Sequence, residues 1–151
     1  MTRVNMGIPV RCLTDEHLLA EHREIKRIPQ VYVNSLRSGS IGRIPKSFCL
    51  GKGHVLFFVD KPRYTLSRYR QLHRECLRRG FNVEDYSSNW NCYPKRMFDN
   101  ATRSSVRIVT MLVSRISERV LSSPKRVFHY YGVAIKKTDA IKLLHYAENK
   151  I

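Results

Sequence analysis

The sequence contains neither a long apolar run nor a cluster of cysteines. No stretch of about 18 apolar residues occurs, so a transmembrane helix is excluded, and the N-terminal residues lack the apolar segment of a signal peptide. The four cysteines, Cys12, Cys49, Cys76 and Cys92, are far apart, and the six histidines form no H-x-x-x-H pair. Metal ligands normally cluster in sequence, so we expect no metal site. The pattern is typical of reduced thiols in a cytoplasmic protein.

Acidic side chains are also scarce. There are 12 Asp and Glu against 28 Lys and Arg, which gives a net charge of +16 and a pI near 10.2. A folded domain this basic usually binds a polyanion, with DNA or RNA as the leading class and an anionic membrane surface as the weaker alternative. The hydrophobic fraction of 42% fits a folded globule, and 151 residues predict a single domain.

Three segments have the apolar periodicity of helices. The first is expected over residues 15–38, kinked at Pro29, because proline removes a backbone donor and clashes with the preceding turn. The second is expected over residues 63–79, closed by Gly80, and the third over residues 104–122. Thr14 at the start of the first segment is the predicted N-cap.

The remaining segments are predicted to be mostly loops. The region 41–60 contains a short apolar run, 55–59, which is either a buried turn or a short strand. The aromatic cluster 128–131 could stack on bases or pack against the first helix. Thr138 is expected to cap a short last helix. We therefore predict an all-α fold: a compact single domain of three main helices with long loops and a short C-terminal helix.

One acid, Glu24, lies among cationic groups on the first predicted helix. At 3.6 residues per turn, His17, Glu21 and Arg27 fall on roughly the same side as Glu24. Arg23 and Arg27 are four residues apart and flank the acid. His17 could orient DNA or the acid, or it could only cap and pack the start of the helix.

The N-terminus offers a second reactive group. The chain begins Met1-Thr2-Arg3, and a small second residue usually allows removal of the initiator methionine. An α-amine has a pKa of about 7.7–8, against about 10.4 for lysine, so more of it is an unprotonated nucleophile at neutral pH. Such an amine can displace a base from a sugar and leave an iminium ion, after which the 3′-phosphate leaves by β-elimination. A carboxylate such as Glu24 can stabilise the cationic sugar and move protons. The alternative is a solvated amine and a surface acid.

Arginine side chains could bind the phosphates of DNA. Arg3, Arg23 and Arg27 could hold phosphates on either side of a sugar, because the planar guanidinium donates paired hydrogen bonds. Arg115 and Arg119 lie four apart in the third predicted helix and could form a second contact strip. A solvated charged face is the alternative for both sets.

These residues lie in blocks that resemble the phage-type endonuclease V, a pyrimidine-dimer DNA glycosylase with AP-lyase activity and not the deoxyinosine-specific nuclease of similar name. The matching blocks are residues 1–5, 17–24, 50–55, 57–58, 60–61, 75–82, 130–132 and 134–135. They occur in the family's order, which predicts a glycosylase/AP-lyase domain over residues 1–135 and a C-terminal extension of unknown role over residues 136–151. Val127 stands where the family pattern has tryptophan.

The resemblance implies a mainly helical, monomeric enzyme without metal or cofactor, which acts on damaged double-stranded DNA, in the host cytoplasm if it is phage-encoded. Thr2 would supply the nucleophilic amine and Glu24 the catalytic carboxylate. The residues implied to bind DNA are Arg3, His17, Arg23, Arg27, Arg115 and Arg119. The family kinks the duplex and flips out a base opposite the dimer.

The expected reaction is cleavage of the glycosidic bond of the 5′ pyrimidine in a cyclobutane pyrimidine dimer, followed by a strand nick through β-elimination. The alternative is a non-catalytic basic DNA- or RNA-binding protein. That alternative explains the net charge of +16. It does not explain why Thr2, Glu24 and the clustered arginines occur together.

Overall fold

A computed structural model describes residues 4–149, and these residues form six α-helices, four short 3₁₀-helices and one β-hairpin. The α-helices are α1 (Asp15–Ile25), α2 (Ile28–Ser38), α3 (Gly53–Val59), α4 (Pro62–Arg78), α5 (Val106–Ser122) and α6 (Lys137–Glu148). The 3₁₀-helices are η1 (Val10–Cys12), η2 (Ser40–Arg43), η3 (Ser87–Cys92) and η4 (Lys95–Asp99). The antiparallel strands are β1 (Val127–Tyr130) and β2 (Val133–Lys136), with Val127 opposite Lys136. The predicted all-α class is confirmed.

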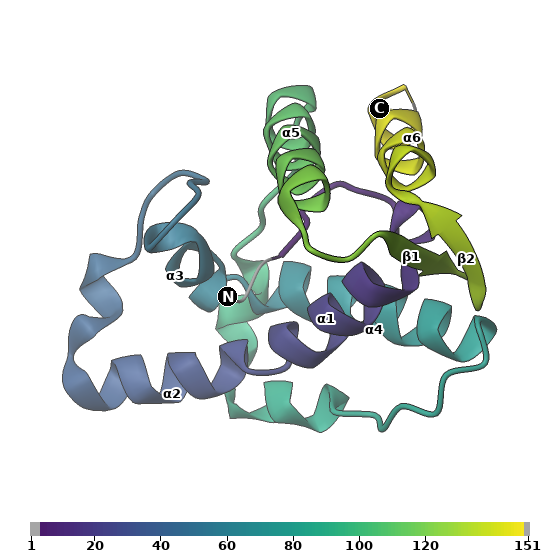
Figure 1. Ribbon diagram of the computed structural model, residues 1–151. Coiled ribbons are helices and arrows are strands. Elements are labelled where there is room, and N and C mark those ends of the chain that lie inside the picture. Colours follow the sequence, from purple (N-terminus) through teal and green to yellow (C-terminus); the bar gives the residue numbers. More distant parts are fainter. Residues whose placement is uncertain (1–3, 150–151) are drawn as a thin grey trace.

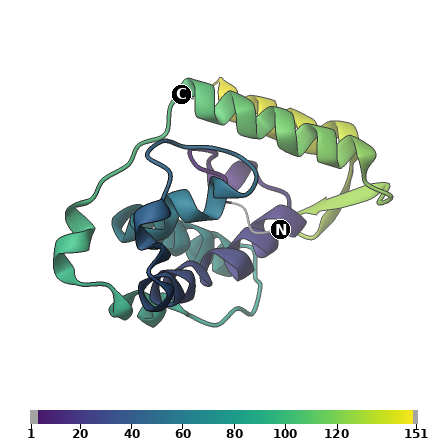
Figure 2. The same cartoon turned by 90° about the vertical axis from the view of Figure 1, so that its left-hand side faces the viewer.

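The helices form a packed lower group and an upper pair. In Figure 1, α1 and α4 pack against each other at the centre, with α2 and α3 to one side. Helices α5 and α6 lie side by side, as Figure 2 shows, and the hairpin joins them. Strand β1 contacts α1, so the upper pair is tied to the lower group. Among the described residues, no helix is long and apolar enough to span a bilayer.

The predicted first helix is two helices. Thr14 is the N-cap as expected, and its hydroxyl accepts a hydrogen bond from the His17 backbone N–H at 3.2 Å. Helix α1 ends at Ile25, however, and α2 starts at Ile28. Pro29 therefore lies in the first turn of a new helix, where its missing N–H removes no hydrogen bond. One helix ends and another begins at the position where only a kink was predicted.

Three smaller predictions need correction. The apolar run 55–59 is neither a turn nor a strand but most of α3, a helix of 7 residues that is too short for its periodicity to show. The aromatic cluster 128–131 lies in the hairpin, whose strands were not predicted, but Phe128 stacks on His17 of α1, which confirms the predicted packing against the first helix. The last helix starts at Lys137 and runs for 12 residues, with Lys136 and not Thr138 in the N-cap position.

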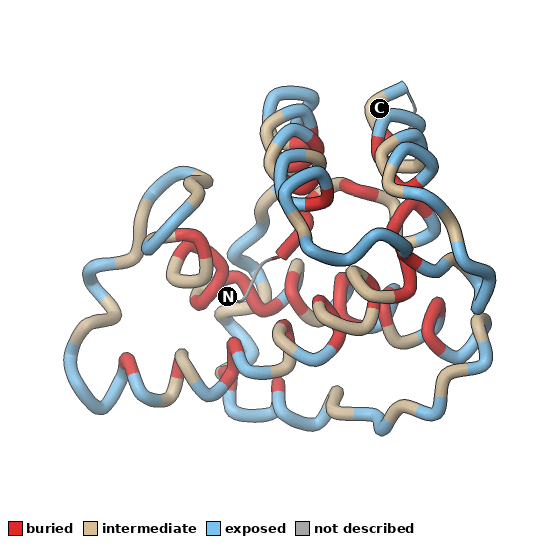
Figure 3. The backbone as a smooth tube through the Cα atoms, viewed as in Figure 1, coloured by how far each residue is buried: buried red, intermediate tan, exposed pale blue. Residues whose placement is uncertain are grey.

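The hydrophobic core is built from the N-terminal segment and from all six helices, including α1, α4 and α5. Figure 3 shows buried residues along the facing sides of these helices. Leu18, Leu72 and Leu112, from α1, α4 and α5, are fully buried. Their removal from water contributes about 2 kcal/mol each. Residues of α1 and α5 line the cavity described next.

Candidate active site

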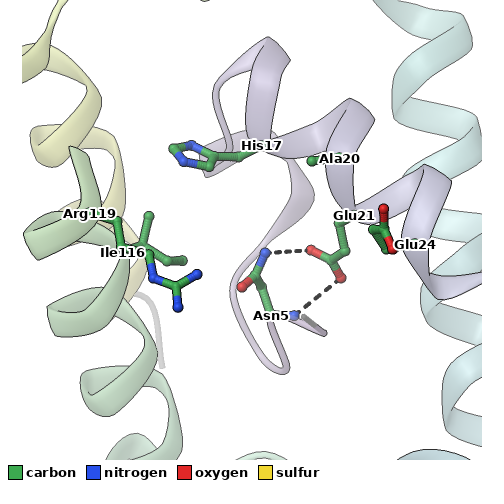
Figure 4. Close-up of a pocket in the computed structure, with 7 residues that line it drawn as sticks. All are labelled: Asn5, His17, Ala20, Glu21, Glu24, Ile116 and Arg119. Carbon is green, nitrogen blue, oxygen red and sulfur yellow. Dashed lines mark hydrogen bonds between the residues drawn. The ribbon is translucent and has the colours of Figure 1, made fainter. Parts of the chain in front are cut away.

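A cavity of about 180 Å³ lies between α1 and α5. Figure 4 shows the side chains that line it: Asn5, His17, Ala20, Glu21, Glu24, Ile116 and Arg119. The first residue belongs to the N-terminal segment, the next four to α1 and the last two to α5. The structure thus brings His17, Glu24 and Arg119, three of the predicted site residues, to one cavity.

Glu24 lies in the last turn of α1 with two arginines on its carboxylate. Arg27 Nη1 is 2.9 Å from Glu24 Oε2, and Arg23 Nε is 3.5 Å from Oε1. The Glu24 side chain is 16% exposed, whereas both arginine side chains are more than 60% exposed. The helix dipole disfavours an acid at this end, so the arginines offset an unfavourable position. Since their heads lie in solvent, they can also reach DNA phosphates.

Glu21, less than one turn earlier, has a different environment. Its carboxylate accepts hydrogen bonds from Arg68 Nε at 2.7 Å and Arg68 Nη2 at 3.0 Å, with both side chains at most 3% exposed. Burial alone would lower the pKa of Arg68, but the Glu21 carboxylate outweighs it and raises that pKa. Arg68 also donates to the Ile8 carbonyl at 2.6 Å. Glu21 is thus held as part of the cavity wall.

Asn5 joins the N-terminal segment to this pair. Its Nδ2 donates to Glu21 Oε1 at 2.8 Å, and its backbone N–H donates to Oε2 at 3.3 Å. Its own Oδ1 is buried and accepts no hydrogen bond within the described part of the chain. In Figure 4 this oxygen lies on the side of Asn5 that faces α5. Asn5 therefore offers the cavity an acceptor, a role that sequence reasoning missed because a lone asparagine carries no spacing signal.

His17 lines the cavity as a largely buried ring. Burial lowers the pKa of His17, and the nearby Glu16 and Glu21 only partly oppose that effect. Its Nδ1 lies 2.8 Å from the Thr14 hydroxyl, and its ring stacks on Phe128 with centroids 5.7 Å apart. His17 is therefore a neutral hydrogen-bonding group at physiological pH, with its orientation fixed from two sides.

The other predicted site residues are not all at this cavity. Thr2 and Arg3 lie outside the described residues. Arg115 lies one turn before Arg119 on α5 and lines a separate hollow with Leu50 and Glu118. Within residues 4–149, no group of three or more His, Cys, Asp or Glu side chains is placed to hold a metal ion.

Comparison with protein families identifies a related family. The family model described as pyrimidine dimer DNA glycosylase matches residues 1–88 of the 151. The matched part includes the N-terminal segment and α1 to α4, and therefore Asn5, His17, Glu24 and the Glu21–Arg68 pair. Helix α5, which supplies Arg119, lies beyond it. The match covers more than half of the chain, so the protein belongs to the pyrimidine dimer DNA glycosylase family, a family of DNA-repair enzymes.

Proposed function

We propose that this protein cleaves the N-glycosidic bond of the 5′ pyrimidine in a UV-induced cyclobutane pyrimidine dimer, and then nicks the same strand. The nucleophile is the α-amine of Thr2 and the catalytic carboxylate is Glu24. The observation that carries the proposal is the position of Glu24. This acid lines a cavity together with Arg119 from α5, and it lies inside the segment that matches the family.

The first step replaces one bond at the sugar with another. The free amine attacks C1′, the C1′–N1 bond breaks, and the base leaves with a proton while remaining attached to its 3′ neighbour through the cyclobutane ring. The sugar ring opens to give an iminium ion on the Thr2 nitrogen. Covalent catalysis of this kind needs neither a metal nor a cofactor.

The second step uses the positive charge of that iminium ion. The cation acidifies the C2′–H bond, a base removes this proton, and the 3′-phosphate departs with the bonding electrons. Glu24 is suited to stabilise the cationic sugar and to move the protons of ring opening and elimination. Its arginine partners can transfer from the carboxylate to phosphates when DNA enters, which frees Glu24 for this role.

The covalent chain limits the distance between the two catalytic groups. Asn5 lines the cavity, and Thr2 precedes it by three residues. Three residues of extended chain span about 11 Å at most, which supports the proposal that the Thr2 amine acts together with Glu24. The Asn5 hydrogen bonds to Glu21 anchor this segment.

Binding of the damaged duplex is assigned to the residues around the cavity. Arg3, Arg23, Arg27 and Arg119 hold phosphates, Arg115 extends that contact along α5, and His17 and the Asn5 oxygen offer neutral hydrogen bonds. A dimer stacks poorly, so kinking the duplex and flipping a base there costs less than at an intact step. The protein acts as a monomer.

The test is Glu24→Gln on a short duplex with one defined dimer. The substitution keeps the shape but removes the base, so we expect strand nicking to fall by about 100-fold or more while DNA binding is retained. Glu118→Gln is the control, because Glu118 is exposed on α5 and its loss changes the net charge equally. Nicking by Glu24→Gln at the rate of the control would remove Glu24 from the mechanism.

A further inference from the structure

The exposed side of α4 carries a row of arginines that the proposed reaction does not use. Arg63, Arg70 and Arg74 are all exposed, and Leu72 between them is fully buried. At about 100° per residue, the three arginines lie within roughly 40° of one another around the helix axis, on the side opposite Leu72. We call these three residues the α4 arginine face.

These arginines differ from the others on and beside the same helix. Arg68, Arg78 and Arg79 each lie within 4.0 Å of a carboxylate oxygen, from Glu21, Glu75 or Asp15. Within the described part of the chain, no member of the α4 arginine face forms such an ion pair. Like charges on one helix face repel, so this arrangement destabilises the free protein slightly and suits a polyanionic partner.

The surface along the α4 arginine face is hollowed and supplies neutral donors. One hollow, of about 390 Å³, is lined by Arg63, Leu66, Ser67, Arg70, Gln71, Arg74 and Phe98. A second, of about 270 Å³, shares Arg63 and Ser67 and adds Tyr64, Ala101, Thr102 and Arg103. No carboxylate lines either hollow. Arginine with hydroxyl and amide donors is the usual composition of a phosphate-backbone contact.

The α4 arginine face points away from the Glu24 cavity. Helix α4 packs on α1 through its opposite side, where Arg68 binds Glu21 in the cavity wall. The body of α4 therefore stands between the two surfaces. A DNA segment held at the Glu24 cavity leaves the α4 arginine face open to another.

We propose that the α4 arginine face binds the phosphate backbone of a second DNA segment while the Glu24 cavity holds the first. The family acts on DNA, so the abundant polyanion around this protein is duplex DNA. Arg63 and Arg74 are about 16 Å apart along the helix, which corresponds to roughly five phosphates of one strand. Contacts of this kind read no base, so the second segment is bound without sequence or lesion preference.

A second binding surface allows the enzyme to transfer directly from one DNA segment to another. A protein that holds two segments at once can release the first without returning to free solution. The inference goes beyond the proposed chemistry: it requires that the first surface binds DNA, not that Thr2 or Glu24 is catalytic. The bridging measurement therefore uses undamaged DNA, where failure of the bridging idea is distinct from failure of the Schiff-base mechanism.

The test compares two triple variants with the same charge loss. Arg63→Gln/Arg70→Gln/Arg74→Gln removes the α4 arginine face, and Arg37→Gln/Arg43→Gln/Lys46→Gln removes three exposed charges from the region of α2 and η2. Energy transfer between donor-labelled and acceptor-labelled short duplexes reports bridging. We expect the wild type and the control to bridge, and the α4 variant to need about tenfold or more protein for the same signal.

Two further measurements decide the matter. Release of a labelled duplex should speed up with unlabelled competitor for the wild type and the control, but not for the α4 variant. Nicking of a short dimer duplex should be the same for all three proteins. Bridging by the α4 variant at the level of the control would overturn the proposal. So would a parallel loss of single-duplex nicking, since the α4 arginine face would then belong to the first site.

Discussion

At the scale of single residues, two glutamates on α1 show how environment separates roles. Glu21 is buried, and both of its oxygens accept hydrogen bonds from Arg68 and Asn5. Glu24 has arginine partners whose side chains are mostly in solvent. Breaking the buried Glu21–Arg68 pair would leave an unpaired charge inside the protein. The exposed ion pairs of Glu24 can be replaced by contacts with water or DNA at little cost in free energy. Only Glu24 is therefore available to a substrate.

Arg119→Ala should weaken binding of a dimer duplex without abolishing the chemistry. Arg119 lines the Glu24 cavity from α5 and is assigned to a phosphate. Loss of one phosphate contact should make the plot of log affinity against log salt less steep by about 0.9. Fluorescence anisotropy over a salt series measures the slope, with Arg96→Ala on η4 as a control of equal charge. If both variants give the wild-type slope, Arg119 makes no phosphate contact.

At the scale of elements, capping residues in the sequence predicted the ends of helices, but the segments that connect the helices were predicted less well. Thr14 correctly marks the start of α1, and Gly80 follows the end of α4. Pro29 could not distinguish a kink from a new first turn, because proline fits both. The hairpin turn depends on Tyr131 at φ 52°, which only tertiary contacts explain: Asp15 accepts hydrogen bonds from the Tyr131 and Gly132 N–H groups.

The sequence predicted only those contacts of the candidate site that join residues close together along the chain. Glu24 with Arg23 and Arg27 follows from helical spacing, and the structure contains both ion pairs. Arg68 is 47 residues from Glu21, and nothing in the spacing links them. Asn5 also reaches the cavity only through the fold. A single sequence does not reveal which distant segments pack together.

The contact between α1 and α4 should respond to acid through His22. Its Nε2 lies 3.0 Å from His73 Nδ1, its ring packs at a tilt against Tyr69, and Lys26 and Asp85 are the nearby charges. Burial, and to a lesser degree His73, lowers the pKa of His22 from 6.5 to about 4. Between these values the unfolded chain binds more protons than the folded protein, so stability is complete above pH 6.5 and is lost as the pH falls.

This linkage predicts a loss of about 2 kcal/mol in the free energy of unfolding between pH 7 and pH 5. Urea unfolding at both values measures it. In His22→Phe this part of the pH dependence should vanish, whereas His145→Gln, at a mostly exposed histidine on α6, should retain it. An unchanged difference in His22→Phe would show that His22 does not titrate as described.

At the scale of the whole molecule, the upper helix pair supports the site from outside the matched family segment. Helix α6 packs along α5 and buries Ala140, Leu144 and Ala147. Helix α5 in turn supplies Ile116 and Arg119 to the cavity. The division into a domain over residues 1–135 and an extension over 136–151 stays a prediction, and the position of α6 supplies a direct test of it.

Leu144→Ala should lower the free energy of unfolding by about 2–5 kcal/mol, because Leu144 is buried and its truncation leaves a cavity beside α6. Lys142→Ala, at an exposed position of the same helix, should change it by less than about 0.5 kcal/mol. Urea unfolding monitored by circular dichroism compares the two. Equal stability of both variants would mean that α6 is a dispensable extension.

The most direct test of the central claim is borohydride trapping of the protein, with Met1 removed, on a duplex containing one defined pyrimidine dimer. Borohydride reduces an iminium ion to a stable amine and so fixes the protein to the DNA. The account predicts a covalent adduct whose attachment maps to the α-amine of Thr2. An adduct on a lysine, or strand nicking without any adduct, would contradict it.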